Sequence, residues 1–146
     1  MVIAGRTTDY VNELQQFIEK KKLQGQVHIL PNVDFDDLPA LYQNASIFIY
    51  PSQFEGFGIP IMEALQSGVP VIAAKGSCLE ESGGPGSRYV SPNDPADLAE
   101  QIMIIDRDNN LKNSMIEKGK VYAEQFSDEA IANNLMNIYT DLAKTK

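Results

Sequence analysis

The sequence predicts an α/β protein in which a parallel sheet carries helices on both faces. Two observations lead to this fold class. Short apolar runs rich in β-branched residues alternate with amphipathic stretches along all 146 residues, as in successive βαβ units. The run "SIFIYPS" (46–52) is apolar without alternation, which is typical of a strand buried on both faces. Since neither a repeat nor a linker interrupts the pattern, we predict a single domain over residues 1–146.

The first half of the chain supplies three strands and two helices. "VIA" (2–4) is a predicted strand that ends at Gly5, and residues 9–23 form a predicted helix with Asp9 as its N-cap. "VHIL" (27–30) is a predicted strand that ends before Asn32. Residues 36–45 are expected to form a short helix before the buried strand at 46–52.

The second half continues the alternation. The strand "PVIAA" (70–74) is followed by a stretch rich in Gly and Ser (75–87), which we expect to be a loop, and then by the short strand 88–90. Helices are predicted over 95–106, 110–126 and 127–144. Ser127 is the expected N-cap of the last helix. Its apolar stripe contains Phe126, Ile131, Leu135, Ile138 and Leu142.

Composition narrows the possible partners. The formal net charge of −8 argues against a nucleic-acid surface, which would carry a basic stripe. The single cysteine, Cys78, excludes an intrachain disulfide, and no cluster with metal-ligand spacing is present. No apolar run reaches the ~20 residues that span a bilayer, and the first residues lack a signal-peptide pattern. We therefore expect a cytoplasmic protein without a metal site.

The most informative stretch is "FEGFGIPIMEA" (54–64), which follows the strand at 46–52. Ligands of an open parallel sheet bind at the carboxyl ends of its strands, where this loop lies. Gly56 and Gly58 allow a tight turn and a close approach of a ligand. Pro60 fits the first position of a helix, which makes Ile59 the expected N-cap. Because Ile59 offers no side-chain acceptor, the first N–H groups of this helix are expected to be free for a phosphate.

Two glutamates flank this turn. Glu63 lies off the stripe that packs on the sheet, so it is free to accept hydrogen bonds from a vicinal diol such as a ribose. Glu55 lies on the other side of the glycines. Two carboxylate acceptors on either side of free N–H groups predict a site for a polyol–phosphate–polyol ligand, such as a nucleotide-sugar. The spacing alone slightly favours a structural alternative, in which Glu63 only stabilises the helix dipole and Glu55 is a solvated loop residue.

The stretch 51–74 also resembles the donor-binding segment of retaining glycosyltransferases with the GT-B fold, in particular glycosyltransferase family 4 (group 1). The family signature is a Glu, seven intervening residues and a second Glu. The residues that match it are Glu55, Gly56, Phe57, Gly58, Pro60, Glu63, Ala64, Gly68, Pro70 and Val71. Flanking segments from "VIAG" to "YVSPNDPADLAEQI" are similar to the family as well. The resemblance implies the Rossmann-like C-terminal half of a GT-B fold.

This resemblance assigns roles to individual residues. Glu63 would bind the ribose hydroxyls, and Glu55, the candidate catalytic residue, would contact the donor sugar near its reacting end. Backbone N–H groups of Phe57, Gly58 and Ile59 would hold the diphosphate and sugar hydroxyls. The loop 30–33, with Leu30, Pro31 and Asn32, would lie against the base. Arg6, at the end of the first strand, is placed to reach a phosphate, although an exposed structural role is the alternative.

The resemblance also predicts what the whole enzyme does. Family members transfer a sugar with retention of configuration, generally without a metal, so the nucleotide-sugar is a substrate and no cofactor is expected. The family's diphosphate-binding Arg and Lys precede "VIAG", and its N-terminal domain carries the acceptor site and often the membrane contact. We therefore expect a fragment of a longer two-domain enzyme that is inactive alone, with peripheral contact at the inner membrane face through the other domain. Glu80 stands where the family usually has proline, so the chain departs from the family pattern at the sugar edge of the site.

Three other functions compete with this prediction. A GT-B-fold nucleotide-sugar epimerase shares the sheet but not the full motif, and a non-catalytic nucleotide-sugar-binding module would not require both glutamates. A flavodoxin-like signalling domain would require an acidic cluster after the first strand, where "AGRTT" has none.

Among the remaining candidate residues, Lys75 and Glu81 have structural alternatives, and Cys78 has no histidine near it in the sequence. The aromatic residues Tyr42, Phe48 and Tyr50 are expected to be core.

Overall fold

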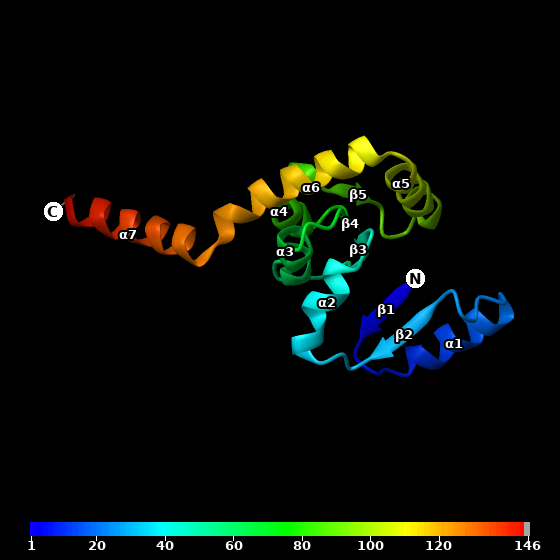
Figure 1. The fold of residues 1–146 in the computed structure, drawn as a ribbon. Helices are drawn as coiled ribbons and strands as arrows, with labels where there is room; N and C mark the ends of the chain where they lie inside the picture. Colours follow the sequence, from blue (N-terminus) through cyan, green and yellow to red (C-terminus); the bar gives the residue numbers. More distant parts are fainter. Residues whose placement is uncertain (145–146) are drawn as a thin grey trace. The chain divides into compact units, whose positions relative to one another are not determined.

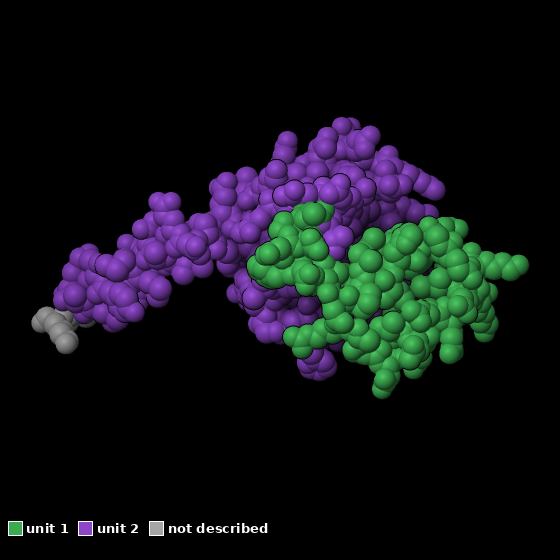
Figure 2. All heavy atoms as spheres, turned by 60° about the horizontal axis from the view of Figure 1, so that its bottom comes forward, with its two compact units in different colours: residues 1–40 green, residues 41–146 purple. Residues whose placement is uncertain are grey.

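The computed structural model describes residues 1–144, and the chain divides into two compact units. Unit 1 is Met1–Ala40 and unit 2 is Leu41–Lys146 (Figure 2). The strands also fall into two parallel sheets, one in each unit, where the sequence pattern predicted one. The single domain stays a prediction.

Unit 1 is built on two parallel strands. β1 (Val2–Gly5) pairs with β2 (His28–Pro31), with Gly5 opposite Pro31, and α1 (Tyr10–Lys20) connects them. A 3-10 turn, η1 (Phe35–Asp37), then leads into α2 (Leu38–Gln43), which contains the unit boundary. Asp9 occupies the predicted N-cap position of α1, but its side chain does not cap the helix. Asp9 already has helical backbone angles, φ −58° and ψ −27°, and its side chain accepts no capping bond, which normally requires an extended backbone.

Unit 2 contains a three-stranded parallel sheet in the order β3-β4-β5. These strands are β3 (Phe48–Tyr50), β4 (Val71–Ala74) and β5 (Arg88–Val90). All of β4 is buried, whereas β3 is only half-buried. The prediction that 46–52 is buried on both faces is therefore wrong. β4 is the central strand of this sheet and β3 is at its edge, with fewer neighbours to cover it.

Helices follow each strand of unit 2 (Figure 1). They are α3 (Ile59–Gln66), α4 (Leu79–Gly83), α5 (Pro95–Arg107), α6 (Asn109–Ala123) and α7 (Asp128–Lys144), with 3-10 turns η2 (Gly84–Gly86) and η3 (Glu124–Phe126). The predicted Gly/Ser loop at 75–87 is thus largely helical. Hydroxyl groups hold it: Tyr89 donates to the carbonyl oxygen of Gly84 at 2.7 Å, and Tyr122 donates to that of Glu81 at 2.6 Å. Such tertiary contacts override the low helix propensity of Gly and Ser.

The core of unit 2 forms between the sheet and its helices. One cluster joins Ile72 and Val90 on the strands to Ile105 on α5 and Met115 on α6. On α3, the buried residues are Ile61, Met62, Ala64 and Leu65. α3 also packs closely on α6, since a Cβ atom at Gly119 would lie 2.7 Å from a methyl group of Leu65. These contacts fix α3 relative to the sheet.

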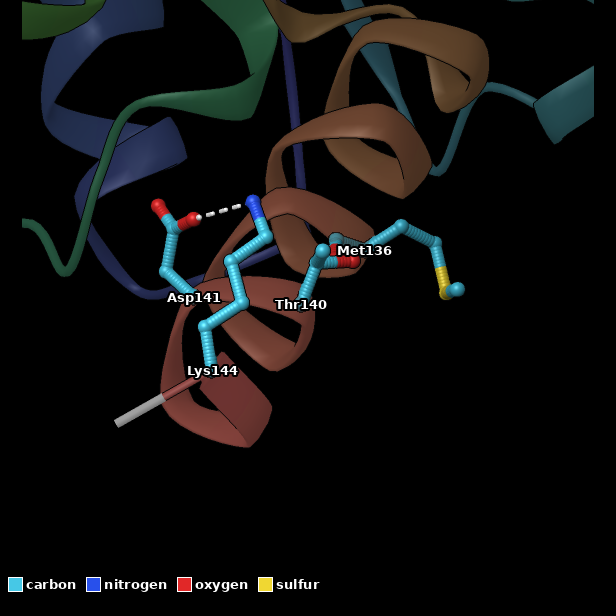
Figure 3. Close-up of polar contacts among 4 residues, drawn as sticks. All are labelled: Met136, Thr140, Asp141 and Lys144. Carbon is cyan, nitrogen blue, oxygen red and sulfur yellow. Dashed lines mark hydrogen bonds and ion pairs between the residues drawn. The ribbon is translucent and has the colours of Figure 1, made fainter. Parts of the chain in front are cut away.

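The last helix, α7, is stabilised within its own turns. Ser127 caps it by accepting from the N–H of Ala130 at 3.2 Å, as predicted. The Thr140 hydroxyl donates to the carbonyl oxygen of Met136 at 2.8 Å. Lys144 and Asp141 form an ion pair at 3.4 Å, marked by the dashed line in Figure 3. Residues 131–144 are all exposed, including four residues of the predicted apolar stripe (Ile131, Leu135, Ile138 and Leu142). The fifth, Phe126, is half-buried and lies edge-on to Phe57 and Tyr122. None of the helices within residues 1–144 combines the length and apolar character that a membrane span requires.

Replacing Ile72 with alanine is expected to lower the free energy of unfolding by about 3 kcal/mol, because the deletion opens a cavity in a well-packed core. Ile72 is 0% exposed on the central strand, whereas Leu142 is 64% exposed on α7. Leu142→Ala is the control and should change the free energy by less than about 0.5 kcal/mol. Urea unfolding followed by circular dichroism measures both. Equal losses would contradict the assignment of β4 to the core.

Candidate functional site

The motif loop of unit 2 turns into α3 at Gly58. Gly58 has left-handed backbone angles, φ 104° and ψ 48°, and occupies the N-cap position. The prediction that Ile59 is the N-cap and Pro60 the first helical residue is therefore one residue off. An L-residue such as isoleucine would be strained at this φ, so glycine takes the turn and the helix begins at Ile59. A Cβ atom at Gly58 would lie 2.8 Å from both Leu79 Cδ2 and Ser82 Oγ of α4, so the backbone packs directly on that helix.

The turn leaves consecutive backbone donors unpaired. Across residues 1–144, no protein acceptor meets the N–H groups of Phe57, Gly58 and Ile59. The N–H of Ile61 is paired with the carbonyl oxygen of Gly58 at 2.9 Å. No side chain caps α3. The free donors at the start of a helix can therefore bind an anion such as a phosphate, as the sequence predicted.

Glu63 projects from α3 beside the buried stripe of that helix. It is half-buried, and its Oε2 accepts a hydrogen bond of 2.8 Å from the hydroxyl of Tyr42 on α2. Burial of Tyr42, followed by its hydrogen bond with Glu63, raises the pKa of the Tyr42 hydroxyl, so this group remains a donor. The bond fixes one carboxylate oxygen of Glu63 and leaves lone pairs for another donor, such as a diol.

Glu55 is exposed in the loop, yet two groups hold it in place. Its Oε1 accepts a hydrogen bond of 2.7 Å from the Tyr50 hydroxyl at the end of β3, and its carbonyl oxygen accepts one of 3.1 Å from Cys78 Sγ. The bond from Tyr50 is the main reason that the pKa of Glu55 is lowered. Burial, followed by the bond to Glu55, raises the pKa of Tyr50 to about 12. Glu55 is thus a carboxylate with a defined orientation at neutral pH.

A row of aromatic rings links these two contacts. Phe48 lies edge-on to Tyr42 with ring centroids 5.3 Å apart, and is stacked with Tyr50 at 5.9 Å. We predicted these three residues as core. Tyr42 is only 8% exposed, whereas Phe48 and Tyr50 are half-buried. The contacts of the hydroxyl groups with the glutamates were missed. The available signal was chemical: a tyrosine in an apolar strand normally needs a hydrogen-bond partner for its hydroxyl.

The remaining predicted site residues lie in unit 1. Arg6 follows β1, Leu30 and Pro31 end β2, and Asn32 comes next, so all four lie at the carboxyl ends of paired strands. Asn32 donates its N–H to the carbonyl oxygen of Gly5 at 2.8 Å, and its side chain donates to the Thr7 hydroxyl at 2.9 Å. The structure therefore gathers the predicted residues into one group in each unit. Their roles in binding stay predictions.

Other features of the described chain lie apart from these groups. A surface hollow occurs at the carboxyl end of α3, opposite Gly58, and is lined by Gln66, Lys120, Ala123, Glu124 and Ser127. Lys75, at the end of β4, uses its N–H to bond the carbonyl oxygen of Val90 at 2.9 Å. Within residues 1–144, no three acidic, histidine or cysteine side chains are grouped as metal ligands would be.

Comparison with known proteins places this geometry in a family. A family model described as "Glycosyl transferases group 1" matches residues 1–122. The chain is 35% identical over 126 residues to O-antigen chain mannosyltransferase B of Escherichia coli, covering 86% of this chain and 33% of that protein. It is 40% identical over 94 residues to the O-antigen chain mannosyltransferase RfbU of Salmonella typhimurium, covering 64% and 26%. The chain thus spans about a third or less of these relatives.

Solved structures of glycosyltransferase domains have the same fold as this chain. The HepE protein of Anabaena in complex with UDP and glucose matches with a TM-score of 0.82 at 26% identity, over 97% of this chain and 40% of that one. The C-terminal domain of LpcC, a group 1 family glycosyl transferase from Francisella tularensis, matches with a TM-score of 0.72 at 25% identity, over 80% and 62%. The chain belongs to the group 1 glycosyl transferases. The predicted fold class, the Rossmann-like C-terminal half of a GT-B fold, is confirmed.

Replacing Gly58 with alanine is expected to lower the free energy of unfolding by about 2 kcal/mol or more. The left-handed backbone strains an L-residue, and the new methyl group would meet α4. Gly56→Ala is the matched control from the same turn, because nothing lies within 4 Å of a Cβ atom there and its φ is not positive. Urea unfolding compares the two variants. Equal stability of both would contradict the packing of Gly58 on α4.

Replacing Tyr50 with phenylalanine is expected to raise the pKa of Glu55 toward its ordinary value of 4.5, because the main donor to the carboxylate is removed. Since the pKa of Glu55 is lowered in the folded protein, this bond stabilises the fold fully above the ordinary pKa. Its contribution disappears as the pH falls through the lowered value. Carboxyl ¹³C NMR titration of Glu55 measures the shift, with Tyr139→Phe on α7 as the control. An unchanged midpoint in Tyr50→Phe would show that this bond does not hold the charge.

Proposed function

We propose that this chain is the donor-binding domain of a retaining glycosyltransferase of family 4, which moves a sugar from a nucleotide-sugar to an acceptor. The observation that carries the proposal is the loop 55–63. It presents three unpaired N–H groups between two glutamates, and a tyrosine orients each glutamate. Membership in the group 1 family supports the choice of a transferase over an epimerase or a non-catalytic binding module.

The site assigns one part of the donor to each group. The N–H groups of Phe57, Gly58 and Ile59 bind the diphosphate and stabilise the negative charge that develops on it as the glycosidic bond breaks. Glu63 accepts hydrogen bonds from the ribose hydroxyls, and Glu55 accepts them from the transferred sugar. For Arg6 and residues 30–32 we keep the roles expected from the sequence, contact with a phosphate and with the base respectively. We assign Glu55 a positioning and electrostatic role rather than that of a nucleophile.

The donor class follows from the relatives. The E. coli and Salmonella proteins are named as mannosyltransferases of O-antigen chains, and the Anabaena structures hold UDP with glucose and UDP-glucose. We therefore propose a nucleoside diphosphate hexose as the donor and a growing polysaccharide as the acceptor. The nucleotide-sugar is a substrate, so the reaction as proposed uses neither a cofactor nor a metal.

The chain supplies only part of this reaction. It spans 33% of its E. coli relative, and its predicted site residues all belong to the donor side. We assign the cations that bind the diphosphate to the segment that precedes "VIAG" in the family. Acceptor binding and peripheral contact with the inner membrane face are assigned to a separate domain. On this basis the 146-residue chain binds a donor but does not turn it over. A cytoplasmic location accompanies this proposal.

An amide NMR titration tests the proposal directly. The chain is titrated with UDP, GDP and ADP and with their glucose or mannose conjugates. One nucleotide is expected to shift the amide signals of Phe57, Gly58 and Ile59, with a dissociation constant of about 1 mM, or about −4 kcal/mol, as half a site would retain. Glu63→Ala should lose this response. Glu100→Ala, an exposed glutamate on α5, is the matched control and should keep it.

Two outcomes would count against the proposal. Shifts confined to other parts of the chain would exclude the loop as the donor site. If no nucleotide shifts the loop at 10 mM or so, the chain lacks the binding that the proposal requires, since that limit is only about −3 kcal/mol. A chelator added to the positive titration should leave the shifts unchanged if binding is metal-independent.

A further inference from the structure

Each glutamate of the loop is held by the hydroxyl of one tyrosine from another element. Tyr42 on α2 donates to Glu63 Oε2 at 2.8 Å, and Tyr50 on β3 donates to Glu55 Oε1 at 2.7 Å. These pairs are 21 and 5 residues apart in sequence, so the two tyrosines do not follow from the motif. The glutamates, not the tyrosines, are the residues that the family signature contains.

The tyrosine rings are themselves fixed by packing. Tyr42 is 8% exposed, and its ring is edge-on to Phe48, which stacks on Tyr50. Phe48 and Tyr50 both belong to β3, so this strand carries one of the two tyrosines and packs against the ring of the other. A continuous row of contacts therefore runs from Glu63 through Tyr42, Phe48 and Tyr50 to Glu55.

This row has a direct consequence for ligand binding. A free glutamate side chain on a surface samples several rotamers, and ordering it on binding costs conformational entropy. A hydrogen bond from a packed ring removes much of that cost beforehand. Each bond uses one lone pair of a carboxylate, which has about four, so both glutamates can still accept a hydrogen bond from a ligand hydroxyl.

We propose that Tyr42 and Tyr50 are positioning residues of the donor site, Tyr42 acting through Glu63 on the nucleoside side and Tyr50 acting through Glu55 on the sugar side. This inference rests on the proposed function. It adds two residues that set how tightly each half of the donor is held. It also predicts that the two halves respond separately, because each tyrosine contacts a different glutamate.

Conservative variants that remove only the hydroxyls test the inference. Dissociation constants for UDP and UDP-glucose are measured by NMR titration of the chain, or for the preferred nucleotide and its sugar conjugate if the first titration selects another base. Tyr42→Phe should weaken both probes by a similar factor of about three to ten, as the loss of one hydrogen bond implies. Tyr50→Phe should leave UDP binding unchanged and weaken UDP-glucose by a similar factor.

A second glutamate variant separates positioning from a general structural effect. In a Glu55→Ala background, Tyr50→Phe should no longer change the ratio of the two dissociation constants, because its partner is absent. Tyr89→Phe is the structural control. Its half-buried hydroxyl donates to the carbonyl oxygen of Gly84, so this variant removes a comparable bond without touching either glutamate.

The outcomes distinguish the inference from the function on which it rests. If the unaltered chain binds none of the probes, the proposed function is overturned and the inference falls with it. If the unaltered chain binds but Tyr42→Phe and Tyr50→Phe bind as tightly or more tightly, only the positioning role is overturned. The same holds if both variants weaken UDP and UDP-glucose alike, or if Tyr89→Phe reproduces their pattern.

Discussion

The close packing of Gly58 on α4 is the constraint on which the candidate site depends. A side chain at this position would collide with Leu79 and Ser82, and only glycine adopts its left-handed backbone without strain. The turn ends there, so the N–H groups of residues 57–59 stay free while the next residues enter a buried helix. Leu65, further along α3, packs against α6 at Gly119. These two contacts connect the motif loop, through α3, to the core of unit 2.

Much of the fold could be predicted from periodicity, and the errors have a common cause. The apolar run 46–52 and the strand at β4 look similar as sequences, and only the order of the strands shows that β4 is central and fully buried. Residues 75–87 contain too much Gly and Ser to predict a helix. Their helical turns are stabilised by the hydroxyl of Tyr89, just beyond the segment, and by that of Tyr122, which is 41 residues from its partner Glu81. Local pattern carries no information about such partners.

The features of the site that depend on residues close together in the sequence were predictable. The free N–H groups follow from glycines, a proline and the absence of a capping side chain, although packing moved the N-cap from Ile59 to Gly58. The partners of the glutamates were not predictable, because tyrosines on β3 and α2 look like ordinary core residues until the hydroxyls are placed. The hydrogen bond between Asn32 and Thr7 at the strand ends of unit 1 joins residues 25 apart in sequence, so it was not predictable either. Spacing indicates which residues a motif contains, whereas the fold decides what orients them.

The charge distribution explains how an acidic chain can bind an anionic donor. With a net charge of −8, the protein as a whole repels a diphosphate. Among the described helices of eight or more residues, only α3 has neither a side-chain cap nor an acidic residue in its first turn. Elsewhere Asp94 caps α5, Asp108 caps α6, and Asp128 and Glu129 begin α7. The first turn of α3 therefore has neither a capping side chain nor an acidic residue of its own, which favours an anion at this helix over the others.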